Sequence, residues 1–563
     1  MFQLNDRMNK NPMDMTDVYK ICHMSQYPEG IEWIYETWTP RMSRAEGINH
    51  VCFIGVQGAL AEIVQNFDDH FFNRPLADVI AEHDETIKDI FKKTNPEFAR
   101  THGSEHVKAL WEKRCLPIKV KALPEGTFVP IGVPMFTIEN TDERFFWIPG
   151  YIETQLSSYI WSQMTSATIA STFKQLLVKF ARLTSDEDKV NIQAGDFSMR
   201  GMSSPESAYR TAMGHLLSFD VSATIPVRNY LKAFYQKPTG ALDCNPSTEH
   251  SVMCSYGLDE VLAFLELTTK KFPSGNISIV SDTYDFWNVI SDVLPKVKPQ
   301  IMNRSGKVFI RPDSGDPVDI VAGKEQPYFD TIEAACIYFN HWIDDRSRKD
   351  WKTNEVLFTR IGKEMKWYRH YVNDTTCQCL YEEYEPTVED MGLCEALWNL
   401  FGGIYNDKGY KELDKHIGIT YGDAITIDRA YRICKRLADK GFASTNVSLG
   451  IGSFTYQYVT RDTFGFALKG TAEIMNGQFK KIQKLVKSDT GNFKKSQKGM
   501  VAVVWDNAIN DYKLIDDLDP ETLENIKDNC LQDFFHNGQF YYLNNFDDIK
   551  ALVCSETKRV YNL

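Results

Sequence analysis

Residues able to hold a phosphorylated sugar gather at the ends of short apolar segments in this 563-residue chain. Arginine binds phosphate through paired charge-assisted hydrogen bonds, whereas aspartate suits either a sugar diol or hydrated magnesium. A sugar phosphate needs both residue types. The candidates at the segment ends are Asp196, Phe197, Arg200, Glu249, His250, Asp282, Asp285, Arg311, Asp313, Asp423 and, from a following segment, Arg461.

Glycines near two of these ends would let backbone N–H groups approach phosphate oxygens closely. They are Gly422, which precedes Asp423, and Gly452, which precedes Ser453. Each polar feature also has a structural explanation when taken alone: His250 could be a hydrogen-bonded structural histidine, and Asp285 could begin a helix, where carboxylates are favoured. The convergence of several such turns favours a ligand site.

The elements that would position these side chains follow a βα pattern that begins at about Ile152. Short segments rich in β-branched residues end in polar clusters, and amphipathic helical stretches follow most of them. In a parallel βα barrel the residues after the strands converge on one face. The five clearest strand segments are 189–197, 276–285, 307–317, 416–424 and 446–453, and His250 fits a sixth unit.

We therefore predict an α/β chain in which an irregular βα barrel is joined to an α+β domain. Residues 1–151 and 474–563 mix helical and extended patterns and are expected to form the α+β domain together. Residues 152–473 are expected to form the catalytic barrel. Within it, the segment from about 340 to 414 is charged and aromatic without a clear strand pattern, which indicates an insertion on the barrel.

Composition bounds the function further. The net charge of −13 argues against a broad electrostatic grip on nucleic acid or anionic lipid. The N-terminus lacks the apolar core of a signal peptide and no apolar run is long enough to cross a bilayer, so we expect a cytoplasmic protein. The 12 cysteines are scattered without a CxxC pair, which predicts neither a zinc site nor a disulfide framework.

Seven motifs, found in the same order, resemble the nicotinamide phosphoribosyltransferase family over nearly the whole chain except the insertion. They are TDVYKICHMSQYP, GDFSMRGMSS, STEHS, VSDTYDFWN, IRPDSGDP, YGDAI and VTRD. The resemblance implies formation of nicotinamide mononucleotide and pyrophosphate from nicotinamide and 5-phosphoribosyl pyrophosphate, in NAD salvage. It also implies Mg²⁺, ATP as a co-substrate, and a head-to-tail homodimer with active sites at the interface.

By this resemblance, two aromatic rings clamp the flat base. Tyr19, with Asp17 beside it, would come from the partner subunit and face Phe197. Arg311 and Arg200 would hold the base and ribose phosphate, and Asp313 would accept hydrogen bonds from the ribose hydroxyls. The remaining substrate contacts implied are the loops Gly422-Asp423 and Gly452-Ser453, and a basic group for pyrophosphate or nucleotide phosphates made of Arg41, Arg461 and Lys469.

The resemblance gives His250 a separate role as the residue that accepts phosphate from ATP. Asp285 would orient the His250 imidazole by hydrogen bonding, with Glu249 alongside. The phosphoenzyme would then drive base transfer forward.

One position departs from the family pattern. Ala223 stands where the family has an aspartate that accepts a hydrogen bond from the amide of nicotinamide, and Asp220 is the candidate to compensate for its loss. Without that carboxylate, selection against nicotinate loses its simplest basis. Nicotinate phosphoribosyltransferase therefore stays an alternative, as does a non-catalytic sensor of phosphoribosyl ligands.

Overall fold

The computed structural model describes residues 11–562 apart from 325–326, 345–356, 362–365, 373–378, 423 and 486–494. Two compact units divide the chain. Unit 1 comprises residues 1–175, 195–243 and 452–563, and unit 2 comprises residues 176–194 and 244–451. These boundaries differ from the predicted ones at 151/152 and 473/474, because residues 195–243 and 452–473 make their contacts within unit 1.

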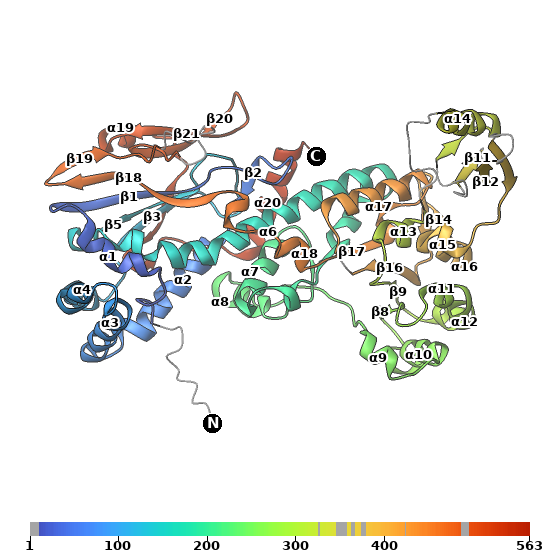
Figure 1. The fold of residues 1–563 in the computed structure, drawn as a ribbon, viewed down its shortest axis with the longest axis horizontal. Helices are drawn as coiled ribbons and strands as arrows, with labels where there is room; N and C mark the ends of the chain where they lie inside the picture. The colour runs from blue at the N-terminus through green and yellow to red at the C-terminus, as the bar shows by residue number, and fades with distance from the viewer. Residues whose placement is uncertain are drawn as a thin grey trace. The chain divides into compact units, whose positions relative to one another are not determined.

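An antiparallel sheet forms the centre of unit 1 (Figure 1). Its strand order is β19 (Gln478–Lys481), β18 (Phe466–Met475), β1 (Ile31–Pro40), β5 (Phe136–Asn140), β3 (Ile118–Ala122), β22 (Gln532–His536) and β23 (Gln539–Phe540). Trp38 on β1 lies between Phe136 and Phe466 of the two adjacent strands, with ring centroids 5.8 and 5.6 Å away. This buried aromatic stack fixes the register of the three central strands.

Helices complete unit 1. Those from the N-terminal part are α1 (Val18–Gln26), α2 (Val56–Phe67), α3 (Leu76–Phe91), α4 (Pro96–Thr101) and α5 (Glu105–Lys113), and the chain ends in α20 (Phe546–Tyr561). The 37-residue helix α6 (Ile148–Thr184) begins in unit 1 and ends in unit 2. The chain then returns to unit 1, where β6 (Ala194–Asp196) pairs in parallel with β7 (Val221–Ser222) and α7 (Pro205–Leu216) lies between them in sequence.

Unit 2 contains the strands of the other four predicted segments. Their order is β17 (Val447–Ile451), β16 (Ile417–Tyr421), β9 (Val308–Arg311) and β8 (Ile277–Val280), and each adjacent pair is parallel. Helices α11 (Phe286–Asn288), α13 (Pro317–Ala322) and α17 (Ile427–Asp439) each follow one of these strands in the chain. The prediction of a mixed α/β fold with a parallel βα sheet is confirmed.

The described residues of the predicted insertion include strands of their own. An antiparallel group formed by β11 (Leu357–Ile361), β12 (Lys366–Val372) and β13 (Cys379–Glu383) is extended by β10 (Tyr328–Phe329) and accompanied by α14 (Ile332–Asp344). Ala335, Phe339 and Ile361 form its small separate core. Charged residues on an exposed strand face hide the alternation of apolar and polar positions, which is why no clear strand pattern marks this segment in the sequence.

No helix in the described part of the chain is long and apolar enough to span a bilayer.

Candidate active site

The ends of β8 and β9 bring an arginine and two aspartates together in unit 2. Arg311, the last residue of β9, donates from Nη1 to Ser247 Oγ at 2.6 Å, and its Nη2 and Nε lie 3.4 Å from the Asp313 carboxylate. The backbone N–H of Asp313 donates to Asp282 Oδ2 at 3.0 Å. Ser247 joins this group because it pairs in parallel with Ser278 of β8.

His250 lies beside the same carboxylates. It is the first residue of the short helix α9 (His250–Cys254), and 46% of its side chain is exposed. Its Nε2 is 3.8 Å from Asp282 Oδ1 and 3.9 Å from Asp313 Oδ2, while Nδ1 is 3.2 Å from Thr283 Oγ1. An exposed imidazole next to two carboxylates is able to accept a group from an incoming substrate.

The other two predicted catalytic carboxylates have local partners. Asp285 caps α11 by accepting a hydrogen bond from the backbone N–H of Asn288 at 3.1 Å, and Glu249 accepts one from the Ser251 hydroxyl. Across the described residues, no hydrogen bond joins either carboxylate to His250. The orienting role expected for Asp285 therefore stays a prediction, and the carboxylates found beside the His250 ring are those of Asp282 and Asp313.

Gly422 follows β16 and packs tightly against this group. A Cβ added at Gly422 would lie 2.8 Å from Asp313 Oδ1, and one added at Gly450 would lie 2.7 Å from the Gly422 Cα. Both positions therefore need glycine if Asp313 is to keep its place. Asp423, predicted to contact substrate, lies outside the described residues.

Phe197 and Arg200 follow β6 in unit 1. Phe197 is half-buried, with its ring so close to Gly195 that a Cβ there would come within 2.9 Å of it, whereas Arg200 is exposed. Asp196 is fully buried, and its carboxylate accepts hydrogen bonds from the N–H and hydroxyl of Ser198 and from the hydroxyls of Ser222 and Thr224. Asp196 therefore organises the loop that presents Phe197.

Gly452 and Ser453 begin the short helix α18 (Ser453–Tyr456), also in unit 1. The Ser453 side chain occupies the space that a Cβ at Gly201 would need, so it packs directly against the loop carrying Arg200. Among the described residues, no atom other than those of its chain neighbours lies within 4 Å of a Cβ built on Gly452.

Tyr19 lies on α1 with 58% of its surface exposed. Its hydroxyl donates to Asp17 Oδ2 at 3.0 Å, and Thr154 Oγ1 donates to the same oxygen at 2.8 Å. In the part of the single chain that the structure describes, no ring contact joins Tyr19 to Phe197. Donation of Tyr19 to a partner subunit stays a prediction.

The predicted phosphate-binding residues come from neighbouring segments of unit 1. Arg41 follows β1 and donates from Nε to the Gly465 carbonyl at 3.0 Å, and the Arg44 N–H donates to the Thr463 carbonyl at 2.8 Å. These bonds place the segment after β1 beside the one that contains Arg461.

Lys469 lies on β18 within a group of alternating charges. Its Nζ is 3.6 Å from Glu153, which also pairs with Lys20 at 2.5 Å. Glu36 is buried behind them, and burial first, then the Glu153 carboxylate, raises the pKa of Glu36 to about 7.

The position of Ala223 bears on base selection. Ala223 follows β7 and its N–H donates to the Asp196 carbonyl at 2.8 Å. Asp220 precedes the same strand and pairs with Lys550 at 2.6 Å. Because the two residues flank opposite ends of β7, the structure does not support Asp220 as a replacement for the missing carboxylate.

Sequence reasoning assigned no role to Ser247 and Thr283, although both lie inside motifs that the family resemblance uses. The structure shows Ser247 bound to Arg311 and Thr283 beside His250. Their position within three residues of the candidates Asp282 and His250 was the available signal.

The sequence profile described as the nicotinate phosphoribosyltransferase (NAPRTase) family matches residues 192–539. A nicotinamide phosphoribosyltransferase of Acinetobacter baylyi is 35% identical over 97% of this chain and 97% of its own length. One of Mycoplasma pneumoniae is 30% identical over 81% of this chain and 88% of its own. The crystal structure of nicotinate-nucleotide pyrophosphorylase from Pyrococcus furiosus has a TM-score of 0.52 at 14% identity, and the match covers all of both chains.

These matches extend across both units and include the strand ends of unit 2 that hold Arg311, Asp313 and His250. The chain therefore belongs to the nicotinate phosphoribosyltransferase family and is a pentosyl-transferring enzyme.

Proposed function

We propose that the protein is a nicotinamide phosphoribosyltransferase that forms nicotinamide mononucleotide and pyrophosphate from nicotinamide and 5-phosphoribosyl pyrophosphate. The observation that carries the proposal is the group Arg311, Asp313, Asp282 and His250 at the ends of parallel strands. The choice of base is supported by relatives that share up to 35% of their residues with the chain and are named for nicotinamide.

In the proposed reaction the ring nitrogen of the base forms a bond to C1 of the ribose while the bond from C1 to pyrophosphate breaks. The electron pair of the broken bond leaves with pyrophosphate, so no protein nucleophile is needed. Arg311 would hold the phosphate of the substrate, and Asp313 would accept hydrogen bonds from the ribose hydroxyls; their contact with each other supports a shared role. Fixed donors and acceptors of this kind accelerate the reaction by holding the reactants in line.

Mg²⁺ fits the oxygen ligands of this group. Asp282 is almost fully buried, and its Oδ1 has no hydrogen-bond partner among the described residues, as expected for an oxygen reserved for a cation. Asp282 and Asp313 would hold the ion. When bound, Mg²⁺ would neutralise charge on the departing pyrophosphate.

His250 is proposed as the acceptor of phosphate from ATP. In that step a ring nitrogen forms a bond to the γ-phosphorus, the bond to the bridging oxygen breaks, and ADP leaves with the electron pair. The exposed ring supports this role, since an incoming nucleotide can reach it. The proposed enzyme is a homodimer. In it, Tyr19 of the partner subunit and Phe197 would clamp the base between their rings.

Nicotinate is the alternative base, favoured by Ala223 at the position of the amide acceptor. The test is an incubation of the full chain with 5-phosphoribosyl pyrophosphate, Mg²⁺ and equal concentrations of both bases, followed by mass detection of the products. We expect predominantly nicotinamide mononucleotide. Predominant nicotinate mononucleotide would overturn the choice of base alone, and absence of both products would overturn the proposed function.

A further inference from the structure

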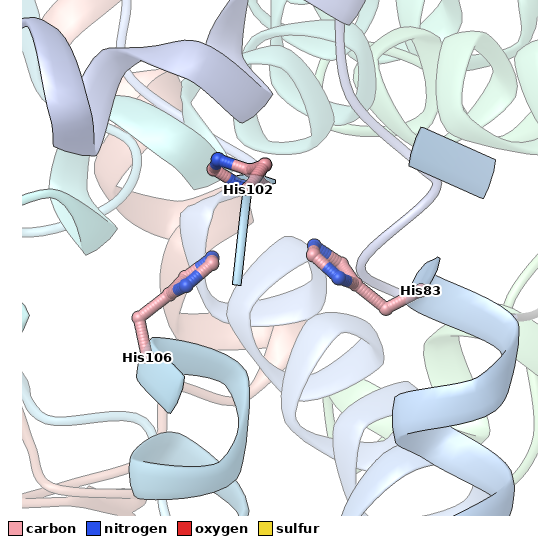
Figure 2. A group of neighbouring side chains, drawn as sticks. All are labelled: His83, His102 and His106. Atoms are coloured by element: carbon pink, nitrogen blue, oxygen red, sulfur yellow. The ribbon is translucent and has the colours of Figure 1, made fainter. Parts of the chain in front are cut away.

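Three histidines of unit 1 face one another at a place that the proposed reaction does not use. His83 lies on α3, His102 directly follows α4, and His106 lies on α5 (Figure 2). One ligand nitrogen from each ring lies within 4.8 Å of the other two. We propose that His83, His102 and His106 form a binding site for a zinc-type transition-metal ion, which links α3 to the segment formed by α4 and α5.

The spacing of the rings suits a shared metal ion. The ring centroids are 5.4 Å apart for His83 and His106, 5.5 Å for His102 and His106, and 6.0 Å for His83 and His102. Three imidazoles bound tetrahedrally at Zn–N distances of about 2.0–2.1 Å would have centroids about 5.2 Å apart. Small movements of the rings toward their centre would therefore bring the three nitrogens to bonding distance.

The hydrogen bonds around His83 leave one of its nitrogens for the metal. Nδ1 of His83 is 3.1 Å from Ser104 Oγ, and Ser104 donates to the Asp84 carboxylate. When Nδ1–H donates to Ser104, Nε2 carries the lone pair. A histidine ligand that donates its other N–H toward a carboxylate is the usual outer arrangement of a metal site.

His102 supplies an independent observation. Its Nε2 is buried and has no hydrogen-bond partner within the described part of the chain. Buried polar atoms are paired in the great majority of cases, because an unpaired one costs about 1–3 kcal/mol. A cluster serving only as aromatic packing against Phe98 and Trp147 would leave this nitrogen unexplained, whereas a metal ion accounts for it.

The surroundings keep the three rings uncharged. Burial first, then the neighbouring His102, lowers the pKa of His83 to about 4, and burial with both neighbours lowers the pKa of His106 to about 3. The pKa of His102 is also lowered by burial. Neutral imidazoles have the lone pairs that a metal needs. Three nitrogen ligands and a fourth position for water favour Zn²⁺ over the hard cations Mg²⁺ and Ca²⁺.

The test uses the full chain freed of metal, with Co²⁺ and Zn²⁺ as probes. His102→Gln keeps a polar side chain of similar length, and His536→Ala removes an exposed histidine on β22 as the matched control. We expect the wild type and His536→Ala to bind one equivalent of Co²⁺ with tetrahedral visible absorption, and Zn²⁺ to raise their unfolding temperature by about 5 °C. His102→Gln should lose both effects.

Circular dichroism without metal shows whether His102→Gln is folded, and His106→Gln serves as a second variant in the same assays. Undiminished Co²⁺ absorption in both folded variants would overturn the site, as would a wild type that binds no Co²⁺ at millimolar concentration. Because these readouts do not involve base transfer, their outcome is independent of the proposed function.

Discussion

Two aspartates that follow parallel strands use their carboxylates in opposite ways. Asp196 at the end of β6 is fully buried, and hydrogen bonds from Ser198, Ser222 and Thr224 occupy both of its oxygens. Asp313, after β9, has 30% of its side chain exposed beside His250. The same residue type thus stabilises a loop in one case and lies partly exposed beside His250 and Arg311 in the other, and its hydrogen-bond partners distinguish the two.

The largest expected effect comes from removing the arginine that accompanies Asp313. Arg311→Ala should lower kcat/KM for 5-phosphoribosyl pyrophosphate by about 1,000-fold, because a preorganised charge-assisted contact to phosphate is lost. Arg369→Ala on β12 removes the same charge from the insertion module and is the control. Equal kcat/KM values for Arg311→Ala and Arg369→Ala in steady-state assays would contradict a specific role of Arg311 in holding phosphate.

Asp196→Ala should act on stability. Losing a buried carboxylate that accepts four hydrogen bonds leaves buried donors unpaired, so we expect about 3 kcal/mol of lost unfolding free energy. Urea unfolding measures this loss, with the exposed Asp188→Ala as control. A variant as stable as the wild type but inactive would mean that Asp196 acts on substrate.

Glu36 differs from both Asp196 and Asp313. Its side chain is buried, and its Oε2 has no hydrogen-bond partner among the described residues. Its pKa of about 7 exceeds the ordinary 4.5, even though Lys20 and Lys469 act against Glu153 to lower it. The folded state therefore holds this proton more tightly than the unfolded state. Its contribution to stability is present below pH 4.5 and is lost as pH rises through 7.

Glu36→Gln should accordingly gain about 3 kcal/mol relative to the wild type between pH 4.5 and pH 8. Unfolding free energies measured across this range provide the test. A difference between the two proteins that stays constant with pH would show that Glu36 has the same pKa in the folded and unfolded states.

The smallest effect is expected at Gly422. The methyl group of Gly422→Ala would meet Asp313 Oδ1 at 2.8 Å and displace that carboxylate, so kcat/KM should fall about tenfold with little loss of stability. Gly409→Ala is a poor comparison because its φ is positive, whereas Gly103→Ala meets open space away from the candidate active site. Gly103→Ala should therefore retain more activity than Gly422→Ala, and the reverse order would contradict the packing argument.

The strands of unit 2 could be predicted because their β-branched runs end at clear polar turns. The segment 189–197 was less reliable: only Ala194–Asp196 is a strand, and Glu187–Ile192 is a 3₁₀ helix. Local patterns locate elements but leave their ends uncertain by a residue or more.

The candidate site was predictable only where partners are close in sequence. The donors that occupy Asp196 include Ser222 and Thr224, 26 and 28 residues away, so the sequence could not separate this aspartate from Asp313. The histidine group was missed for a related reason. His102 and His106 are four residues apart, but His83 comes from another helix and only the fold brings it to them.

Binding of 5-phosphoribosyl pyrophosphate tests the central claim most directly. Titration calorimetry with Mg²⁺ present should give a dissociation constant at least about 100-fold larger for Arg311→Ala than for the wild type. Arg369→Ala should match the wild type. Equal affinity in all three proteins would contradict the claim that the strand ends of unit 2 hold the activated sugar.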